Sequence, residues 1–219
     1  MTLPEGADPR LHDLGRVIAR YVLRPAFSVR VRGLDRVPRT GPVVLVANHS
    51  TLVEPQLIFG MLPRRSVFLV KEELFTGAMG WLLRRIGQLS VRRGEPDRVP
   101  LLTAVRVLRA GGLVGVFPEG SRGAGDVATA ERGAAWLVRA SGAVVLPVAV
   151  RGTLRPPGRG RRFRPVVDLV VGEPFGLPVG PGRAGLVTAT ERLRTELAAL
   201  VRTVDEQRAT SARTGEKNA

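Results

Sequence analysis

The stretch VVLVANHSTLVEP at residues 43–55 decides the fold predicted for this chain. Its first five residues form an unbroken, mostly β-branched apolar run, which predicts a strand buried on both faces of a parallel or mixed sheet. The polar residues 48–51 that follow are typical of turns and of helix N-caps. His49 is therefore expected at the exit of a buried strand, beside the start of a helix.

Glu54 follows His49 by five positions, near the first turn of that helix, where its carboxylate can reach back to the imidazole. A carboxylate that fixes the imidazole tautomer and stabilises the imidazolium makes histidine a general base. The same two residues could instead only cap the turn and complement the helix dipole. Ser50 adjoins His49 but lacks the G-x-S-x-G elbow, so we do not predict a serine nucleophile.

Apolar runs and amphipathic segments alternate on both sides of this stretch. The predicted strands lie at 28–33, 43–47, 67–70, 89–91, 113–117, 143–150 and 165–171. The predicted helices lie near 11–27, 52–62, 71–87, 97–109, 129–140 and 184–204. This alternation predicts an α/β fold in which helices flank a mostly parallel central sheet.

The first predicted helix is basic and amphipathic. Its apolar positions fall on one helical face, at Leu11, Leu14, Val17, Ile18, Tyr21 and Val22, and three arginines lie off it. Such a helix lies on a membrane surface or packs its apolar face on the domain core, and both hold if the helix lies at the edge of the domain. The predicted organisation is a disordered start plus this helix (1–27), one folded domain (28–205) and a disordered tail (206–219).

Charge and composition narrow the classes of function. The net charge of +15 implies an anionic partner, either nucleic acid or an anionic membrane surface. Aromatic residues are only 5% and no nucleic-acid-binding motif is present, so nucleic acid is not the expected partner. The absence of cysteine excludes disulfides, and the missing Gly-rich fingerprints argue against a nucleotide cofactor. No apolar run approaches the roughly 18 residues of a membrane-spanning helix.

A second polar motif, FPEGSRG at 117–123, follows another buried strand. Gly120 and Gly123 let backbone N–H groups approach an anion, and Arg122 can bind a phosphate with two N–H groups. Arg93, which follows the strand at 89–91, adds a second positive charge. An arginine-rich loop at 151–164 is a further candidate for binding anionic lipid or donor phosphates.

The carboxyl ends of parallel strands share one sheet edge, so this motif is expected beside His49. There Ser121 can donate a hydrogen bond, and Glu119 can accept one from a polyol hydroxyl. Together these residues predict a site for a phosphorylated alcohol whose hydroxyl is activated by His49. We expect acyl transfer to that hydroxyl without a protein nucleophile.

These motifs, in this order, resemble the PlsC-like glycerolipid acyltransferases, the lysophosphatidate or 1-acylglycerol-3-phosphate O-acyltransferases. NHSTLVE at 48–54 is similar to their N-H-x-x-x-x-D box, with Glu54 in place of the aspartate. FPEGSR at 117–122 is similar to their F-P-E-G-T-R box. IGQLSVRR at 86–93 and VLPV at 145–148 resemble the two remaining blocks.

The resemblance implies a role for each matching residue. His49 would be the general base and Glu54 its orienting carboxylate. Glycerol phosphate would be bound by Arg93, Glu119, Gly120 and Arg122, with Ser121 beside them, and Pro147 would shape the acyl-donor side. The donor would be a fatty acyl-CoA or an acyl carrier protein thioester, with no metal and no cofactor.

The implied activity converts 1-acylglycerol-3-phosphate to phosphatidate in a peripheral protein at the cytoplasmic face of the cell membrane. Two alternatives stay open. One is a different lysophospholipid or glycolipid acceptor. The other is a catalytically weakened lipid-binding relative, because the extra methylene of Glu54 moves the carboxylate by about 1 Å.

Overall fold

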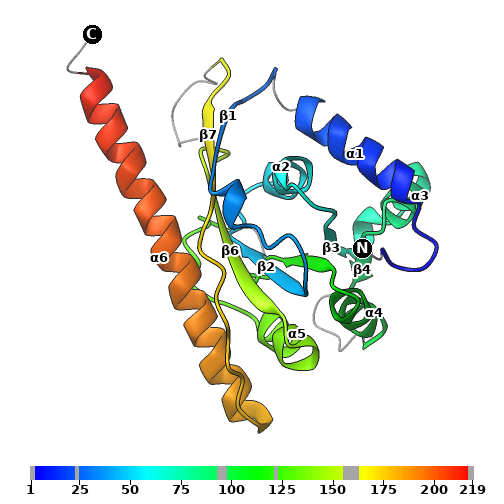
Figure 1. Ribbon diagram of the computed structural model, residues 1–219. Coiled ribbons are helices and arrows are strands. Elements are labelled where there is room, and N and C mark those ends of the chain that lie inside the picture. Colours follow the sequence, from blue (N-terminus) through cyan, green and yellow to red (C-terminus); the bar gives the residue numbers. More distant parts are fainter. Residues whose placement is uncertain (1–2, 23–24, 93–97, 121–122, 155–162, 217–219) are drawn as a thin grey trace.

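The computed structural model describes residues 3–22, 25–92, 98–120, 123–154 and 163–216 (Figure 1). A 7-stranded sheet forms its centre, in the order β1-β7-β6-β2-β5-β3-β4. The strands are β1 (Ser28–Arg32), β2 (Val43–Ala47), β3 (Val67–Lys71), β4 (Leu89–Val91), β5 (Leu113–Val116), β6 (Val144–Arg151) and β7 (Val166–Val171).

Strand direction decides where polar side chains gather. Strands β2 to β6 all run the same way, with Val46 of β2 in register with Val116 of β5 and Pro147 of β6. Strand β7 is antiparallel to β6, and β1 is parallel to β7. The sheet is therefore mostly parallel, as predicted, and the residues that follow β2 to β6 emerge at one edge.

Helices cover both faces of the sheet, as the alternation of apolar runs and amphipathic segments predicted. The helices are α1 (Pro9–Val22), α2 (Val53–Met61), α3 (Gly77–Arg85), α4 (Arg98–Arg109), α5 (Gly133–Ser141) and α6 (Gly182–Glu216), with short 3₁₀ turns at Leu34–Arg36 and Glu72–Leu74. Alternate β2 residues face opposite layers, so Val44 and Val46 pack with α4, α5 and α6. Val43 and Leu45 pack with α2 and with apolar residues of α1 and α3.

The described part of the N-terminal segment, residues 3–9, is more ordered than the sequence predicted. Asp8 caps α1, because its Oδ1 accepts hydrogen bonds from the main-chain N–H groups of Arg10 (2.8 Å) and Leu11 (3.2 Å). The main-chain N–H of Asp8 also donates to the carbonyl of Arg85 at the end of α3 (2.8 Å). These bonds begin the helix at Pro9 and attach it to α3, and α1 ends at Val22 rather than at residue 27.

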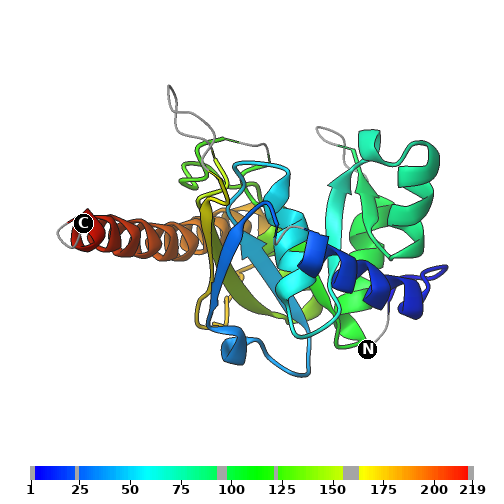
Figure 2. The same cartoon turned by 90° about the horizontal axis from the view of Figure 1, so that it is seen from above.

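The C-terminal helix is longer than predicted. Helix α6 continues to Glu216, whereas we expected disorder from residue 206. Its buried residues Leu197, Val201 and Val204 pack on the core, and Arg208 then pairs with Asp168 of β7. This ion pair extends the attachment by one turn, and the final turns project past the sheet (Figures 1 and 2). Residues 206–209 are good helix formers, so the helix continues beyond the last core contact.

Candidate active site

The predicted pair of His49 and Glu54 is formed at the exit of β2. Nδ1 of His49 lies 3.1 Å from Oε2 of Glu54, the second residue of α2. Glu54 is completely buried and His49 nearly so. When the carboxylate accepts a hydrogen bond from Nδ1–H, the unprotonated Nε2 is the atom that can take up a proton.

The Glu54 carboxylate is surrounded by donors. Oε2 accepts from the main-chain N–H groups of Ser50 (3.0 Å) and Thr51 (2.7 Å). Oε1 accepts from the hydroxyl groups of Thr51 (3.3 Å) and Thr153 (2.6 Å). Burying a carboxylate is costly unless it is hydrogen-bonded, and these charge-assisted bonds offset that cost. The sequence did not identify Thr153 as part of the site.

Asn48 connects the exits of two neighbouring strands. Its Nδ2 donates to the carbonyl of Val150 (3.0 Å), and the N–H of Val150 donates to its Oδ1 (2.8 Å). Asn48 is completely buried, so it is a structural element of the site. The sequence carried one signal for this role, a polar residue directly after an unbroken buried run.

The second motif lies against the first, as expected from parallel strands. Glu119, which follows β5, accepts a 2.8 Å hydrogen bond from the main-chain N–H of His49. The N–H of Gly123 donates to the His49 carbonyl (3.1 Å), and the Phe117 ring lies 4.5 Å from the imidazole, centroid to centroid. Burial raises the pKa of Glu119, and the hydrogen bond from His49 opposes that rise.

Gly120 adopts a conformation that favours glycine, with φ of 68°. A Cβ at this position would lie 2.3 Å from Oε1 of Glu131. Arg93, Ser121 and Arg122 lie outside the residues that the structure describes. The substrate-binding roles of Gly120, Arg93, Ser121 and Arg122, and that of Glu119, therefore stay predictions.

Pro147 is placed differently from the other predicted site residues. It lies inside β6, in register with Val46, and is not at the exit of the strand. Its ring contacts the segment after β7, where a Cβ at Gly172 would lie 2.9 Å from Cγ of Pro147. Its proposed part in shaping the donor side stays a prediction.

Two arginines near this edge form ion pairs with acidic residues of the chain. Arg92 pairs with Glu72, with 2.5 Å between Nε and Oε2, and so joins the exits of β3 and β4. Arg151 ends β6, pairs with Asp205 of α6 (2.7 Å) and donates to the carbonyl of Ala124 (2.9 Å). Arg151 therefore fixes β6 to α6, whereas most of the predicted arginine-rich loop, residues 155–162, lies outside the described ranges.

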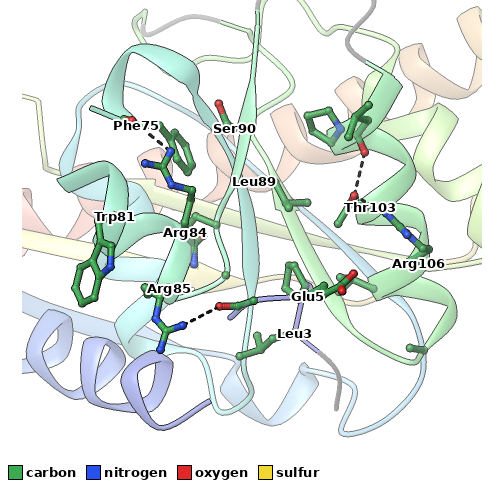
Figure 3. A pocket seen from close by; sticks show the side chains of 18 residues that line it. Leu3, Glu5, Phe75, Trp81, Arg84, Arg85, Leu89, Ser90, Thr103 and Arg106 are labelled. Atoms are coloured by element: carbon green, nitrogen blue, oxygen red, sulfur yellow. Dashed lines mark hydrogen bonds between the residues drawn. The ribbon is translucent and has the colours of Figure 1, made fainter. Parts of the chain in front are cut away.

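A separate hollow of about 860 Å³ runs beside the edge strand β4, between α3 and α4 (Figure 3). Apolar residues including Leu3, Phe75, Trp81 and Leu89 line it, together with Arg84 and Arg106. His49, Glu54 and Glu119 do not line this cavity. The predicted catalytic pair thus lies at the sheet edge rather than in this hollow.

Comparison with known proteins shows which family the chain belongs to. The family model described as Acyltransferase matches residues 28–151, which include both motifs and strands β1 to β6. The chain belongs to the Acyltransferase family. The protein is thus an acyltransferase, as its sequence motifs predicted.

Named relatives of this acyltransferase agree with the assignment. It is 28% identical over 194 residues to a 1-acyl-sn-glycerol-3-phosphate acyltransferase of Bacillus subtilis, covering 85% of this chain and 95% of that protein. It is 30% identical over 173 residues to one of Streptococcus pneumoniae, covering 76% and 63%. The crystal structure of the 1-acyl-sn-glycerophosphate acyltransferase PlsC of Thermotoga maritima matches with a TM-score of 0.65 and 26% identity, over 91% and 79% of the chains.

Proposed function

We propose that this acyltransferase moves a fatty acyl group from a thioester donor to the free hydroxyl of 1-acylglycerol-3-phosphate, giving phosphatidate. The observation that carries the proposal is the 3.1 Å contact between Nδ1 of His49 and Oε2 of Glu54. It leaves Nε2 as the proton acceptor at the edge where the second motif meets the first. The names of the relatives support the choice of acceptor.

In the proposed reaction, Nε2 of His49 takes the proton of the acceptor hydroxyl as its oxygen attacks the thioester carbonyl. The tetrahedral intermediate then breaks its carbon–sulfur bond, and the thiolate takes the proton back from His49 as it leaves. An ester and a thiol are the products, and His49 returns to its neutral form. The buried Glu54 carboxylate stabilises the imidazolium between the two proton transfers.

The test is acyl transfer from a long-chain acyl-CoA, and separately from an acyl carrier protein thioester, to lysophosphatidate in mixed micelles. We expect phosphatidate from the wild type and a loss of about 10²- to 10⁴-fold in kcat for His49→Ala. His12→Asn is the matched control, because it removes the other histidine of the chain. Absence of phosphatidate with both donors, while another lysophospholipid is acylated, would overturn the choice of acceptor.

We propose further that the protein acts at an anionic membrane surface through α1. Leu14, Val17, Ile18, Tyr21 and Val22 are each at least half exposed, so most of the apolar face of α1 is left uncovered, although Leu11 and Ala19 pack against the core. No helix within the described ranges is long and apolar enough to span a bilayer. An exposed apolar helix face on a strongly basic protein suits attachment at the lipid interface.

The arginines of α1 explain why its apolar face points outward. Arg16 donates to the carbonyl of Leu62, and Nε of Arg20 donates to the carbonyl of Gly60 (3.2 Å) at the end of α2. Positive side chains are favourable at a helix C-terminus, where the carbonyls lack partners. A Cβ at Gly60 would lie 2.7 Å from the main-chain nitrogen of Arg20, so the two helices approach closely.

Cosedimentation with vesicles of phosphatidylglycerol and phosphatidylcholine tests this attachment. We expect the wild type to bind and the double variant Val17→Glu/Ile18→Glu to remain in the supernatant. Val187→Glu is the control, because Val187 is equally exposed but lies on α6, across the sheet. Equal binding by the α1 variant and the control would show that another surface meets the membrane.

A further inference from the structure

We infer that Thr153 is a positioning residue for the proposed base and acts through Glu54. The hydroxyl of Thr153 donates a 2.6 Å hydrogen bond to Oε1 of Glu54, and Oε2 of the same carboxylate faces Nδ1 of His49 at 3.1 Å. The carboxylate is therefore held between Thr153 and the imidazole. The inference rests on the proposed role of His49 as general base.

The donors to Glu54 are not equivalent. The main-chain N–H groups of Ser50 and Thr51 both bond Oε2, the oxygen that also faces His49. A carboxylate fixed at one oxygen can still rotate about the bond that joins it to the side chain, and a bond to its other oxygen sets its plane. At Oε1 the Thr51 hydroxyl is 3.3 Å away and the Thr153 hydroxyl is 2.6 Å away, so Thr153 makes the stronger bond.

Thr153 is well suited to anchor Glu54 because the chain that leads to it is fixed. It lies 99 positions after Glu54 in the sequence and two residues beyond β6. The main chain of Val150 is bonded twice by Asn48, and Arg151 is paired with Asp205. The hydroxyl therefore comes from a segment attached to both β2 and α6.

A fixed anchor matters more for glutamate than for aspartate. Glu54 has one more rotatable bond than the aspartate of the similar box, so its carboxylate loses more conformational freedom when it is held in place. A displacement of about 1 Å at a catalytic group can cost on the order of 10²-fold in rate. The Thr153 bond thus compensates for the longer side chain at this position.

Steady-state kinetics with acyl donor and lysophosphatidate test the inference. We expect Thr153→Val, which keeps the shape but removes the hydroxyl, to lower kcat by roughly 10- to 100-fold with little change in KM for either substrate. Thr153→Ser should restore most of the rate. Thr203→Val removes a hydroxyl that bonds only within the exposed face of α6, and it should leave both constants unchanged. Unchanged kcat for Thr153→Val would overturn the inference.

A double-mutant cycle with Glu54→Asp separates positioning from a general packing effect. If Thr153 acts through the longer carboxylate, Thr153→Val should cost much less in the Glu54→Asp background than in the wild type. If Thr153 had only a structural role, Thr153→Val would lower kcat by the same factor in the wild type and in the Glu54→Asp background. That equality would contradict the inference.

The tautomer of His49 gives a readout that does not depend on turnover. Ring ¹⁵N shifts of the wild type should show the Nδ1–H tautomer, and Thr153→Val should show a mixture of tautomers. The chain has only two histidines, so His12→Asn assigns the signals. If the wild type shows no acyl transfer, that result counts only against the proposed function, because the tautomer comparison does not need turnover. If Thr153→Val leaves the tautomer of His49 unaltered, the positioning role of Thr153 is refuted.

Discussion

The Asn48 side chain forms paired hydrogen bonds with the main chain of Val150, at 3.0 Å and 2.8 Å. The register between β2 and β6 ends at Ala47 and Val148, so the N–H and C=O of Val150 lie beyond the last backbone pairing. The Asn48 side chain supplies one donor and one acceptor to Val150, in place of the backbone groups that β2 would offer if it continued. The turn that carries His49 is therefore joined directly to the segment that carries Thr153.

Asn48→Ala should destabilise the protein strongly. It leaves the buried N–H and C=O of Val150 without the side chain that pairs them, and the cost of two such groups is on the order of 3 kcal/mol. Urea unfolding measures this loss as a lower midpoint at constant slope. Thr203→Ala, which removes an exposed hydroxyl of α6, should change the free energy of unfolding little. Equal stabilities of the two variants would show that the Val150 groups need no partner.

Gly125 should not tolerate a side chain. Its φ is 69°, and a Cβ would lie 2.2 Å from Oγ of Ser50 and 2.9 Å from Nδ2 of Asn48. Left-handed backbone alone costs an alanine roughly 1–2 kcal/mol, and the clash adds to this. We expect Gly125→Ala to lower both the melting temperature and kcat, because it presses on the turn that holds His49.

Gly133→Ala is the matched control for Gly125→Ala. Gly133 begins α5, and a Cβ there would meet nothing within 4 Å. Alanine should be neutral or slightly stabilising at this position. Loss of activity in both variants would show that the effect is not specific to the turn.

His12 should make the protein less stable in mild acid. It is buried between α1 and the domain, with Nδ1 2.6 Å from the Ile86 carbonyl. Burial lowers the pKa of His12 below its usual 6.5, and the nearby charges of Arg16 and Arg65 lower it further. The hydrogen bond to Ile86 and the charge of Asp13 act against this lowering of the pKa. Since the unfolded chain binds the proton first, this stability is complete above pH 6.5 and is lost as the pH falls below it.

Urea unfolding at pH 7.5 and at pH 5.5 measures that effect. The free energy of unfolding should fall less between these pH values for His12→Asn than for the wild type. Asparagine keeps an amide donor that can reach the Ile86 carbonyl and has no titrating group. Parallel losses in the two proteins would refute the assignment.

The stability that depends on Glu119 should change with pH in the direction opposite to that of His12. Burial raises the pKa of its carboxyl group above the usual 4.5, so the folded state holds the proton more tightly than the unfolded state. Stability from this group is complete below pH 4.5 and is lost as the pH rises through the raised pKa. Glu119→Gln, whose amide oxygen can still accept from the His49 N–H, should gain stability relative to the wild type as pH rises from 4.5 to 7.5. A constant difference in unfolding free energy across that range would contradict this.

The layered α/β fold and the approach of the two motifs were predictable because both follow from local patterns. Buried β-branched runs fix the strands, and parallel strands deliver the residues that follow them to one edge. This reasoning placed His49 beside Glu54 and the second motif beside both. It failed where a long-range contact changes a local preference. The Arg208–Asp168 pair extends α6, and the contact of Asp8 with Arg85 orders the N-terminal segment.

The sequence by itself determined the sheet, its helical layers and the pairing of His49 with Glu54, because strand burial and a five-residue separation are properties of neighbouring residues. Only the tertiary structure decided which side of α1 faces outward, since that depends on Arg16 and Arg20 meeting the carbonyls at the end of α2. Only the tertiary structure identified Thr153 as a partner of Glu54. Their 2.6 Å contact joins positions 99 residues apart, and no local pattern records which hydroxyl will meet a buried carboxylate when two strands end side by side.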